Sequence, residues 1–133
     1  MSEGETGGAD YPDVHREGRS QIGHEGLSDI NSLLEKLGAK LREPNLKSSA
    51  RMLMIITLSI NRKLTFTDLL QLTSLGKGSL SNHIDRLRED GLVLTRTVFS
   101  FSGPRVIVEI TESGLEVYRD YLKLMKQLMD LQA

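Results

Sequence analysis

A short stretch near the middle of the chain combines a lysine, an arginine, an asparagine and two serines with a regular set of apolar residues. Leu80, Ile84 and Leu87 recur at steps of four and three, which is the spacing of one face of a helix. We therefore expect a helix over 79–90 that buries these three side chains and turns its polar side chains outward. A guanidinium can pair with guanine or phosphate, an amide can pair with adenine, and small hydroxyls allow a backbone to approach closely. The outward side chains with this chemistry are Lys77, Ser79, Ser81, Asn82 and Arg86.

A polar outer face is also what any amphipathic surface helix presents to water. The position of the helix in the chain distinguishes a helix that binds DNA from an ordinary surface helix. A glycine-containing turn over 73–78 joins it to an earlier helix that begins at Thr65, where Thr65 and Asp68 have the spacing of a capping box. Gly91 is expected to end it. Two helices joined by a short glycine turn are typical of a helix-turn-helix, whose second helix enters the major groove of DNA.

Hydrophobic periodicity predicts the elements that position this face. After Gly91 the pattern changes to strict alternation, which indicates a strand, and a second strand follows a turn at residues 100–104. The expected elements are helix 28–41 with Ser28 as its cap, helix 45–61, a helix from Thr65, helix 79–90, a β-hairpin within 93–110 and helix 112–131. The run 52–60 is apolar nearly all round, so we expect helix 45–61 to be buried. The fold class is mainly α with a β-hairpin (α+β), a winged helix-turn-helix with a long C-terminal dimerisation helix.

Two motifs in this order resemble those of ArsR- and MarR-type regulators. LGKGSLSNHIDRLREDGLV, residues 75–93, is similar to the recognition-helix segment of a subgroup of small archaeal and bacterial winged-helix proteins. GPRVIVEIT, residues 103–111, is similar to the end of their wing. The resemblance covers about residues 27–131. It implies a transcription regulator that binds double-stranded DNA, with the recognition helix in the major groove and the wing, 93–110, on the flanking DNA.

The resemblance implies roles for two further residues, each with an alternative. His83 stands where the family often has a histidine at the margin between helix and DNA, but it could instead seal the edge between the helix and the wing. Arg105 matches an arginine at the base of the wing, which would reach a phosphate or the minor groove, or else cover the hairpin with its alkyl stem. The wing tip departs from a DNA-binding surface because residues 98–103 are largely apolar and hold no lysine. Phe99 and Phe101 could therefore pack on a partner.

The first and last helices carry more apolar surface than one core needs. A helix covered on one face needs a single stripe about 100° wide, whereas helix 112–131 has two, and the first helix has the spacing of a heptad seam. This excess predicts a homodimer, although both helices could close on the core of their own chain. The expected interface residues are Leu27, Ile30, Leu34, Leu37, Tyr118, Tyr121, Leu122, Met125, Leu128 and Met129. The family resemblance also leaves room for an unknown small-molecule effector between these helices and the DNA-binding lobe, although no polar cluster marks its site.

Composition narrows the class of protein. The chain has 133 residues, 38% hydrophobic and 26% charged, as expected for one soluble globular domain. It has no cysteine, which excludes a disulfide scaffold, a cysteine nucleophile and a thiolate metal site. Residues 1–26 are rich in glycine and acidic residues, so we expect a flexible tail there and a winged-helix domain over 27–133. Residues 1–40 hold eight acidic and four basic side chains, whereas residues 41–133 hold ten and thirteen, which places the positive charge on the folded part.

We expect no enzyme, no cofactor, no metal and no membrane segment. GKGS, residues 76–79, has no serine directly after its lysine, and Gln71 stands where a phosphate-binding loop needs its first glycine. His15 and His24 are isolated in the expected tail, and a metal site needs three or four convergent ligands. The longest apolar run, 52–60, is shorter than the roughly 20 residues that cross a bilayer, and no secretory signal is present. A cytoplasmic, nucleoid-associated protein is therefore expected.

Two functions remain open at this point. The first is a sequence-specific regulator that binds a palindromic DNA site as a homodimer. The second is a winged-helix protein–protein interaction module of the transcription machinery, without sequence-specific DNA binding, that docks through Phe99, Phe101 and the acidic tail. The polar face of helix 79–90 favours the first function, whereas the weakly charged wing favours the second. The operator, the target genes and the choice between activation and repression lie outside what these residues indicate.

Overall fold

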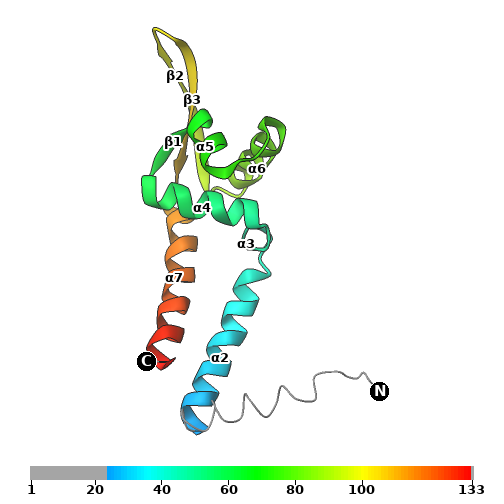
Figure 1. Cartoon of the computed structure of the whole chain (residues 1–133), viewed down its shortest axis with the longest axis vertical. Helices are drawn as coiled ribbons and strands as arrows, with labels where there is room; N and C mark the ends of the chain where they lie inside the picture. The colour runs from blue at the N-terminus through cyan, green and yellow to red at the C-terminus, as the bar shows by residue number, and fades with distance from the viewer. Residues whose placement is uncertain (1–23, 133) are drawn as a thin grey trace, which may run out of the picture. The chain divides into compact units, whose positions relative to one another are not determined.

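The computed structural model describes residues 24–132, and its elements are shown in Figure 1. In chain order they are α2 (His24–Leu41), α3 (Pro44–Lys47), α4 (Ser49–Asn61), β1 (Lys63–Thr65), α5 (Phe66–Thr73), α6 (Lys77–Glu89), β2 (Val93–Ser100), β3 (Gly103–Ile110) and α7 (Glu112–Gln132). The described residues form two compact units, 24–37 with 124–132 and 38–123, so the boundary between the units falls inside α2 and inside α7. Among the described helices, none combines the length and the apolar character needed to span a membrane.

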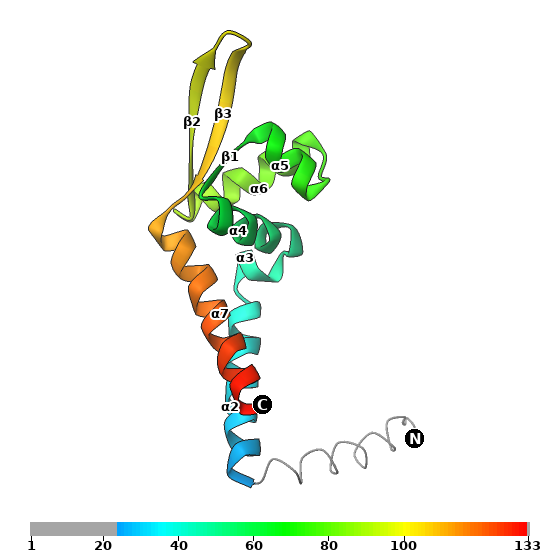
Figure 2. The ribbon, with the colours of Figure 1, turned by 60° about the vertical axis from the view of Figure 1, so that its left-hand side comes forward.

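The larger unit has the expected fold class, mainly helical with one antiparallel hairpin. Its sheet has the strand order β1-β3-β2, in which β2 and β3 form the hairpin and β1 pairs with the outer side of β3. Figures 1 and 2 show α5 and α6 beside the lower part of the hairpin, whose tip extends past both helices. This is the arrangement of a helix-turn-helix with a wing, as the sequence predicts.

The core of the larger unit holds the residues that the periodicity assigns to it. Leu80, Ile84 and Leu87 of α6 are buried, and they pack in one cluster with side chains of α4, α5 and the sheet. The other buried members of the cluster are Met54, Ile55, Leu58, Leu69, Leu92, Val93, Val108, Ile110 and Leu115. Since burial of an apolar side chain contributes about 1.5–3 kcal/mol, these residues hold α6 in a single orientation.

The helix-turn-helix begins and ends largely as expected, but its turn differs in detail. Thr65 caps α5 by accepting a hydrogen bond from the Asp68 amide at 3.0 Å, as the capping-box spacing predicts. The left-handed residue that ends α5 is Ser74, with φ of 57°, and not a glycine. Gly76 then caps α6, so the helix expected over 79–90 runs from Lys77 to Glu89. Lys77 and Gly78 are already helical, so α6 begins two residues before Ser79.

The expected helix 45–61 is two helices, and this prediction was wrong. Ser48 is extended, with φ of −86° and ψ of 115°, and separates α3 from α4. Its hydroxyl accepts a hydrogen bond from the Arg51 amide at 3.2 Å, because a serine side chain can offer the backbone an N-cap in place of a further helical turn. The expected burial of α4 all round was also wrong, since Leu53 and Ile60 are 41% and 66% exposed.

Two other boundaries differ from the sequence prediction. The first described helix begins at His24 and not at residue 28, so Ser28 lies inside α2 and does not cap it. Serine is tolerated inside a helix at a small cost in propensity, and no proline stands before it to stop the helix. The expected tail over 1–26 otherwise lies outside the described residues. Strand β1 was missed because three residues are too few to show a strand period.

The N-terminus of α7 is anchored to the start of the hairpin. The Thr111 hydroxyl donates to the Gly91 carbonyl oxygen at 2.7 Å and accepts from the Gly114 amide at 3.1 Å. Thr111 therefore caps α7, as the sequence predicts, and at the same time ties it to the residue that ends the recognition-helix segment. Gly91 has φ of 74°, which favours glycine and agrees with its predicted role as the stop of α6.

Candidate nucleic-acid interface

The outer face of α6 is open to solvent and carries the polar residues that the sequence singles out. The exposed side chains on or beside this face are Lys77, Ser79, Ser81, Asn82, Asp85 and Arg86. Neither Lys77 nor Arg86 forms an ion pair with another residue of the described range. Two uncompensated cations beside an amide and two hydroxyls match the groups that bind phosphates and read base edges.

The one acidic side chain in the middle of this face is partly neutralised. Arg88 donates from Nη2 to Asp85 Oδ1 at 2.9 Å and from Nη1 to the Thr95 hydroxyl at 3.1 Å. The arginine therefore connects α6 to β2 and reduces the repulsion that Asp85 would exert on an approaching phosphate. Arg88 was not singled out in the sequence, because the role depends on Thr95, which lies on the hairpin.

His83 is held by a residue that the sequence analysis missed. Arg51 of α4 lies with Nη1 3.1 Å from His83 Nδ1 and donates from Nη2 to the Pro44 carbonyl oxygen at 3.1 Å. Because a guanidinium can only donate hydrogen bonds, Nδ1 of His83 accepts and the ring proton sits on Nε2. The hydrogen-bond partner of His83 therefore lies on α4 and not on the wing. Arg51 is the charged residue next to the apolar run 52–60, and this position was the signal that could have pointed to it.

Burial, followed by the positive charges of Arg51 and Arg86, lowers the pKa of His83 from its ordinary value of 6.5. The histidine is therefore neutral at pH 7 in the protein alone. A neutral ring with its proton on Nε2 can still donate one hydrogen bond to a phosphate oxygen. This state is compatible with the phosphate contact implied by the family resemblance.

The lowered pKa predicts how stability depends on pH. Between pH of about 7.5 and 5.5 the unfolded chain takes up a proton on this histidine more readily than the folded chain does, so the free energy of unfolding falls as the pH falls. Urea unfolding of the wild type and of His83→Gln, at pH of about 7.5 and of about 5.5, measures how much of this pH dependence comes from His83. We expect a smaller pH-dependent loss in His83→Gln, whereas His15→Gln serves as a control. Equal losses in the wild type and in His83→Gln would contradict the assignment.

Arg105 is exposed on β3, where it pairs in register with Val98 close to the tip of the wing. The expected place at the base of the wing was therefore wrong, because the base is formed by Val93 and Ile110. Arg105 Nη2 donates to the Ser102 hydroxyl at 3.1 Å, and no described carboxylate lies within ion-pair distance of its guanidinium. The other arginine of the wing, Arg96, lies 3.7 Å from Glu109. Arg105 is thus the less compensated of the two cations, at the end of the hairpin that projects furthest from α6 in Figure 2.

The residues expected at a dimer interface fall into three groups. Ile30 and Leu128 are buried within the smaller unit of one chain, and Tyr118 packs on the core of the larger unit. Leu34, Leu122 and Met129 are exposed, with Leu34 at 49% and Met129 at 62%. The remaining four, Leu27, Leu37, Tyr121 and Met125, are partly buried. The chain therefore uses part of each apolar stripe for its own packing and leaves part of it uncovered.

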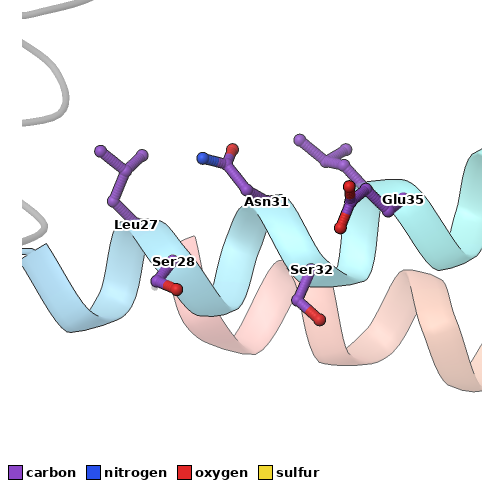
Figure 3. Close-up of a pocket in the computed structure, with 6 residues that line it drawn as sticks. Leu27, Ser28, Asn31, Ser32 and Glu35 are labelled. Carbon is purple, nitrogen blue, oxygen red and sulfur yellow. The ribbon is translucent and has the colours of Figure 1, made fainter.

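A hollow in the smaller unit lies along α2. Among the described residues, those that line it belong to this one helix: Leu27, Ser28, Asn31, Ser32, Leu34 and Glu35. Figure 3 shows Leu27 and Asn31 on one side of the helix and Ser28 and Ser32 on the other.

No group of three or more side chains in residues 24–132 gathers into a metal-ligand cluster. Two exposed carboxylates of this region have hydrogen-bond partners instead: Asp85 accepts from Arg88, and Asp90, which follows α6, accepts from the Asn45 side-chain amide at 2.7 Å. This contact holds α3 against the C-terminal end of α6. Asn45 and Asp90 therefore have a structural role.

Comparison with known proteins relates this architecture to characterised regulators. Residues 50–129 match the family described as the winged helix DNA-binding domain. The transcriptional regulator homologue from Pyrococcus horikoshii OT3 is 32% identical over 72% of this chain and 95% of its own, with a TM-score of 0.64. NadR in complex with 4-hydroxyphenylacetate is 18% identical over 98% of this chain and 82% of its own, with a TM-score of 0.59. BpsR of Bordetella bronchiseptica, whose DNA binding is regulated by 6-hydroxynicotinic acid, is 13% identical over 81% and 73%, with a TM-score of 0.53. The last two show likeness of fold alone, and no curated protein sequence matches.

Proposed function

The chain belongs to the winged helix DNA-binding domain family, and from this premise we propose that it is a transcription regulator that binds DNA as a homodimer. Recognition helix α6 enters the major groove, and the wing formed by β2 and β3 lies on the flanking DNA. The protein acts by binding and not by catalysis. Two copies of α6 in a twofold dimer would read two half-sites about 34 Å apart along the duplex.

The observation that carries this proposal is the exposed outer face of α6. Leu80 and Leu87 are fully buried and Ile84 nearly so, which turns Ser81, Asn82 and Arg86 outward. A recognition helix needs this face to be clear of its own chain, because the face must replace its hydration with contacts to base edges. The structure meets that requirement over the residues it describes.

The basic residues around α6 supply the second support. Lys77, Arg86 and Arg105 are exposed and lack carboxylate partners in the described range. Phosphate contacts provide most of the affinity of such proteins, and they position the reading helix without specifying sequence. We assign Lys77, His83 and Arg105 to phosphate or minor-groove contacts, and Ser79, Ser81, Asn82 and Arg86 to the major groove.

The uncovered parts of the apolar stripes support a homodimer. Leu34, Leu122 and Met129 are large apolar side chains that the chain itself leaves exposed. Because each is already about half buried in its own chain, covering the rest would contribute roughly 1 kcal/mol per side chain, before the cost of association. An effector is a further part of the proposal, supported only by the fold likeness to NadR and BpsR. Titrating 4-hydroxyphenylacetate into the DNA-binding assay tests it.

The decisive experiment compares specific with random DNA. Fragments bound by the purified protein are first selected from genomic DNA. Arg86→Ala and Asn82→Ala should each weaken binding to the selected site roughly 5- to 150-fold, because one bidentate base contact discriminates by about 1–3 kcal/mol. Binding to random DNA should fall much less, and the slope of log affinity against log salt should be steep and negative.

Arg119→Ala is the matched control for Arg86→Ala. Arg119 is an exposed arginine on α7, paired with Glu112 at 2.8 Å, so its removal changes the net charge equally without touching α6. If Arg86→Ala and Arg119→Ala reduce specific binding to the same extent, α6 does not read the sequence. Absence of any duplex binding by the wild type at low salt would overturn the regulator proposal as a whole.

A further inference from the structure

The tip of the wing exposes two phenylalanines that the chain does not use for its own packing. Phe99 is 81% exposed and Phe101 is 114% exposed, so both rings lie almost entirely in solvent. Phenylalanine buries a large apolar area in most proteins, and exposure forgoes that stabilisation. Two such residues at the end of a projecting hairpin form an apolar wedge, which we call the wing wedge.

The turn that presents the wing wedge is held by local hydrogen bonds. The Ser100 hydroxyl donates to the Gly103 carbonyl oxygen at 3.2 Å and lies 3.1 Å from the Ser102 hydroxyl. Gly103 has φ of 105°, a conformation that favours glycine. The tip therefore has a defined turn, and Phe101 projects from that turn.

The wing wedge is continuous with the proposed DNA-binding surface. Thr95 and Thr97 share a strand face with Phe99, because alternate residues of β2 point the same way. These two threonines line a hollow together with Ser81 and Asp85 of α6. Phe99 thus extends, towards the tip, the strand face that borders the recognition helix.

The charge around the wing wedge favours a polyanion. Residues 93–106 hold two arginines, Arg96 and Arg105, and no acidic side chain. Arg105 is exposed and lies two residues beyond the turn, next to the wedge in sequence. Arginines next to apolar wedges are the combination found in proteins that enter the minor groove and separate neighbouring base pairs.

We propose that the wing wedge inserts Phe101 between two base pairs in the minor groove beside the major-groove site, with Arg105 on the adjacent backbone and Phe99 against the sugar edges. This inference rests on the proposed function, and it adds that binding bends the DNA at the wing. An apolar wedge partly unstacks one base step and kinks the duplex by about 20–90°. The flanking sequence is then selected by its deformability, without hydrogen bonds to its bases.

The chain contains no tryptophan, so Phe101→Trp introduces a single indole reporter at the wedge. In the full-length protein, we expect indole fluorescence to be quenched on binding a duplex that contains the selected site, because the ring stacks on a base. The duplex bend, measured by energy transfer between dyes at its ends, should be retained in this variant. Unchanged indole fluorescence on saturation with DNA would overturn the proposal.

The loss-of-function arm uses Phe101→Ser and the double variant Phe99→Ser/Phe101→Ser. Both positions are exposed, so the fold should not depend on them. We expect the bend to be lost and affinity for the selected site to fall on the order of tenfold, as stacking contacts of this kind contribute. The fluorescence of 2-aminopurine placed at the flanking base step should rise when the wild type binds and unstacks it. It should not rise when these variants bind. Ile60→Ser is the matched control, because Ile60 is exposed on α4 away from the wing.

The outcomes separate this inference from the proposed function. Loss of the bend in the serine variants, with specific binding still sensitive to Arg86→Ala, supports the wing wedge. Full retention of bend and affinity in the double variant, while Arg86→Ala still abolishes specificity, overturns the wedge but leaves the regulator intact. The tip would then serve a protein partner. If the wild type binds no duplex at all, both proposals fail together.

Discussion

Replacing Leu34 and Met129 with glutamate together is expected to convert the proposed homodimer into a monomer and to weaken binding to the two-half-site DNA by about 100-fold or more. The second half-site is bound as an intramolecular event in a dimer, and linking two binding modules raises apparent affinity by about 10²–10⁴. A monomer loses this gain even though each recognition helix is unchanged. The loss should therefore disappear when the DNA carries only one half-site.

The structural reason lies in how α2 and α7 use their apolar stripes. On α2, Asp29, Ser32, Leu33 and Lys36 line a hollow shared with residues of α7 in the smaller unit. Leu34 lies on a different side of the same helix and is 49% exposed. A carboxylate placed in an apolar interface must lose its hydration without gaining a partner, which costs several kcal/mol per charge. Two such substitutions per chain outweigh the apolar gain that we expect from the interface.

Light scattering and sedimentation of the purified variants measure the oligomeric state, and titrations with one and two half-sites measure the loss of affinity. Ala39→Glu with Gln127→Glu is the control, because it adds the same two charges at exposed positions outside the predicted interface residues. The control should remain dimeric. If Leu34→Glu/Met129→Glu stays dimeric and binds like the wild type, the two apolar stripes are not the interface.

Gly114→Ala is expected to destabilise the fold by about 1–3 kcal/mol, as overpacking of a tightly fitted site does. A β-carbon at this position would clash with the Leu92 carbonyl oxygen and would lie 2.6 Å from Ile110 Cδ1. The first obstacle is backbone, which cannot rotate away as a flexible side chain can. Accommodating the methyl group must therefore move α7 away from the start of the hairpin, which also strains the Thr111 contact with Gly91.

Gly78→Ala is the matched control for Gly114→Ala. Gly78 also lies in the first turn of a helix, but a β-carbon there would meet nothing within 4 Å, and its φ is not positive. Alanine is favoured over glycine inside a helix by about 0.5–1 kcal/mol, so this variant should be slightly more stable than the wild type. Urea unfolding of both variants gives the comparison. Equal effects of the two substitutions would show that α7 does not approach the hairpin as closely as described.

The elements of the DNA-binding unit could largely be predicted from the sequence. The steps between Leu80, Ile84 and Leu87 correctly assigned the buried face of α6, and alternation correctly placed the hairpin within 93–110. Thr111 correctly marked the start of α7. These predictions succeeded because each depends on neighbours within a few residues, where helix and strand periods differ clearly.

The contacts around the candidate site could not be predicted in the same way. Arg51 meets His83 across 32 positions of sequence, and Arg88 reaches Thr95 on a separate element. Strand β1 is recognisable only by its pairing with β3. In each case the local pattern of residues is compatible with several partners, and the partner is decided by which elements pack together.

The amino-acid sequence by itself determined which faces of the helices are apolar, where the helix-turn-helix and the wing lie, and which polar residues the outer face of α6 carries. These are local properties, set by the repeat distance of each element. Only the tertiary structure decided that the α6 face stays uncovered, that burial and the nearby Arg51 lower the pKa of His83, and that Leu34 and Met129 are left exposed. The physical reason is that burial and pKa depend on atoms brought together from distant parts of the chain. The local hydrophobic periodicity contains no information about such contacts.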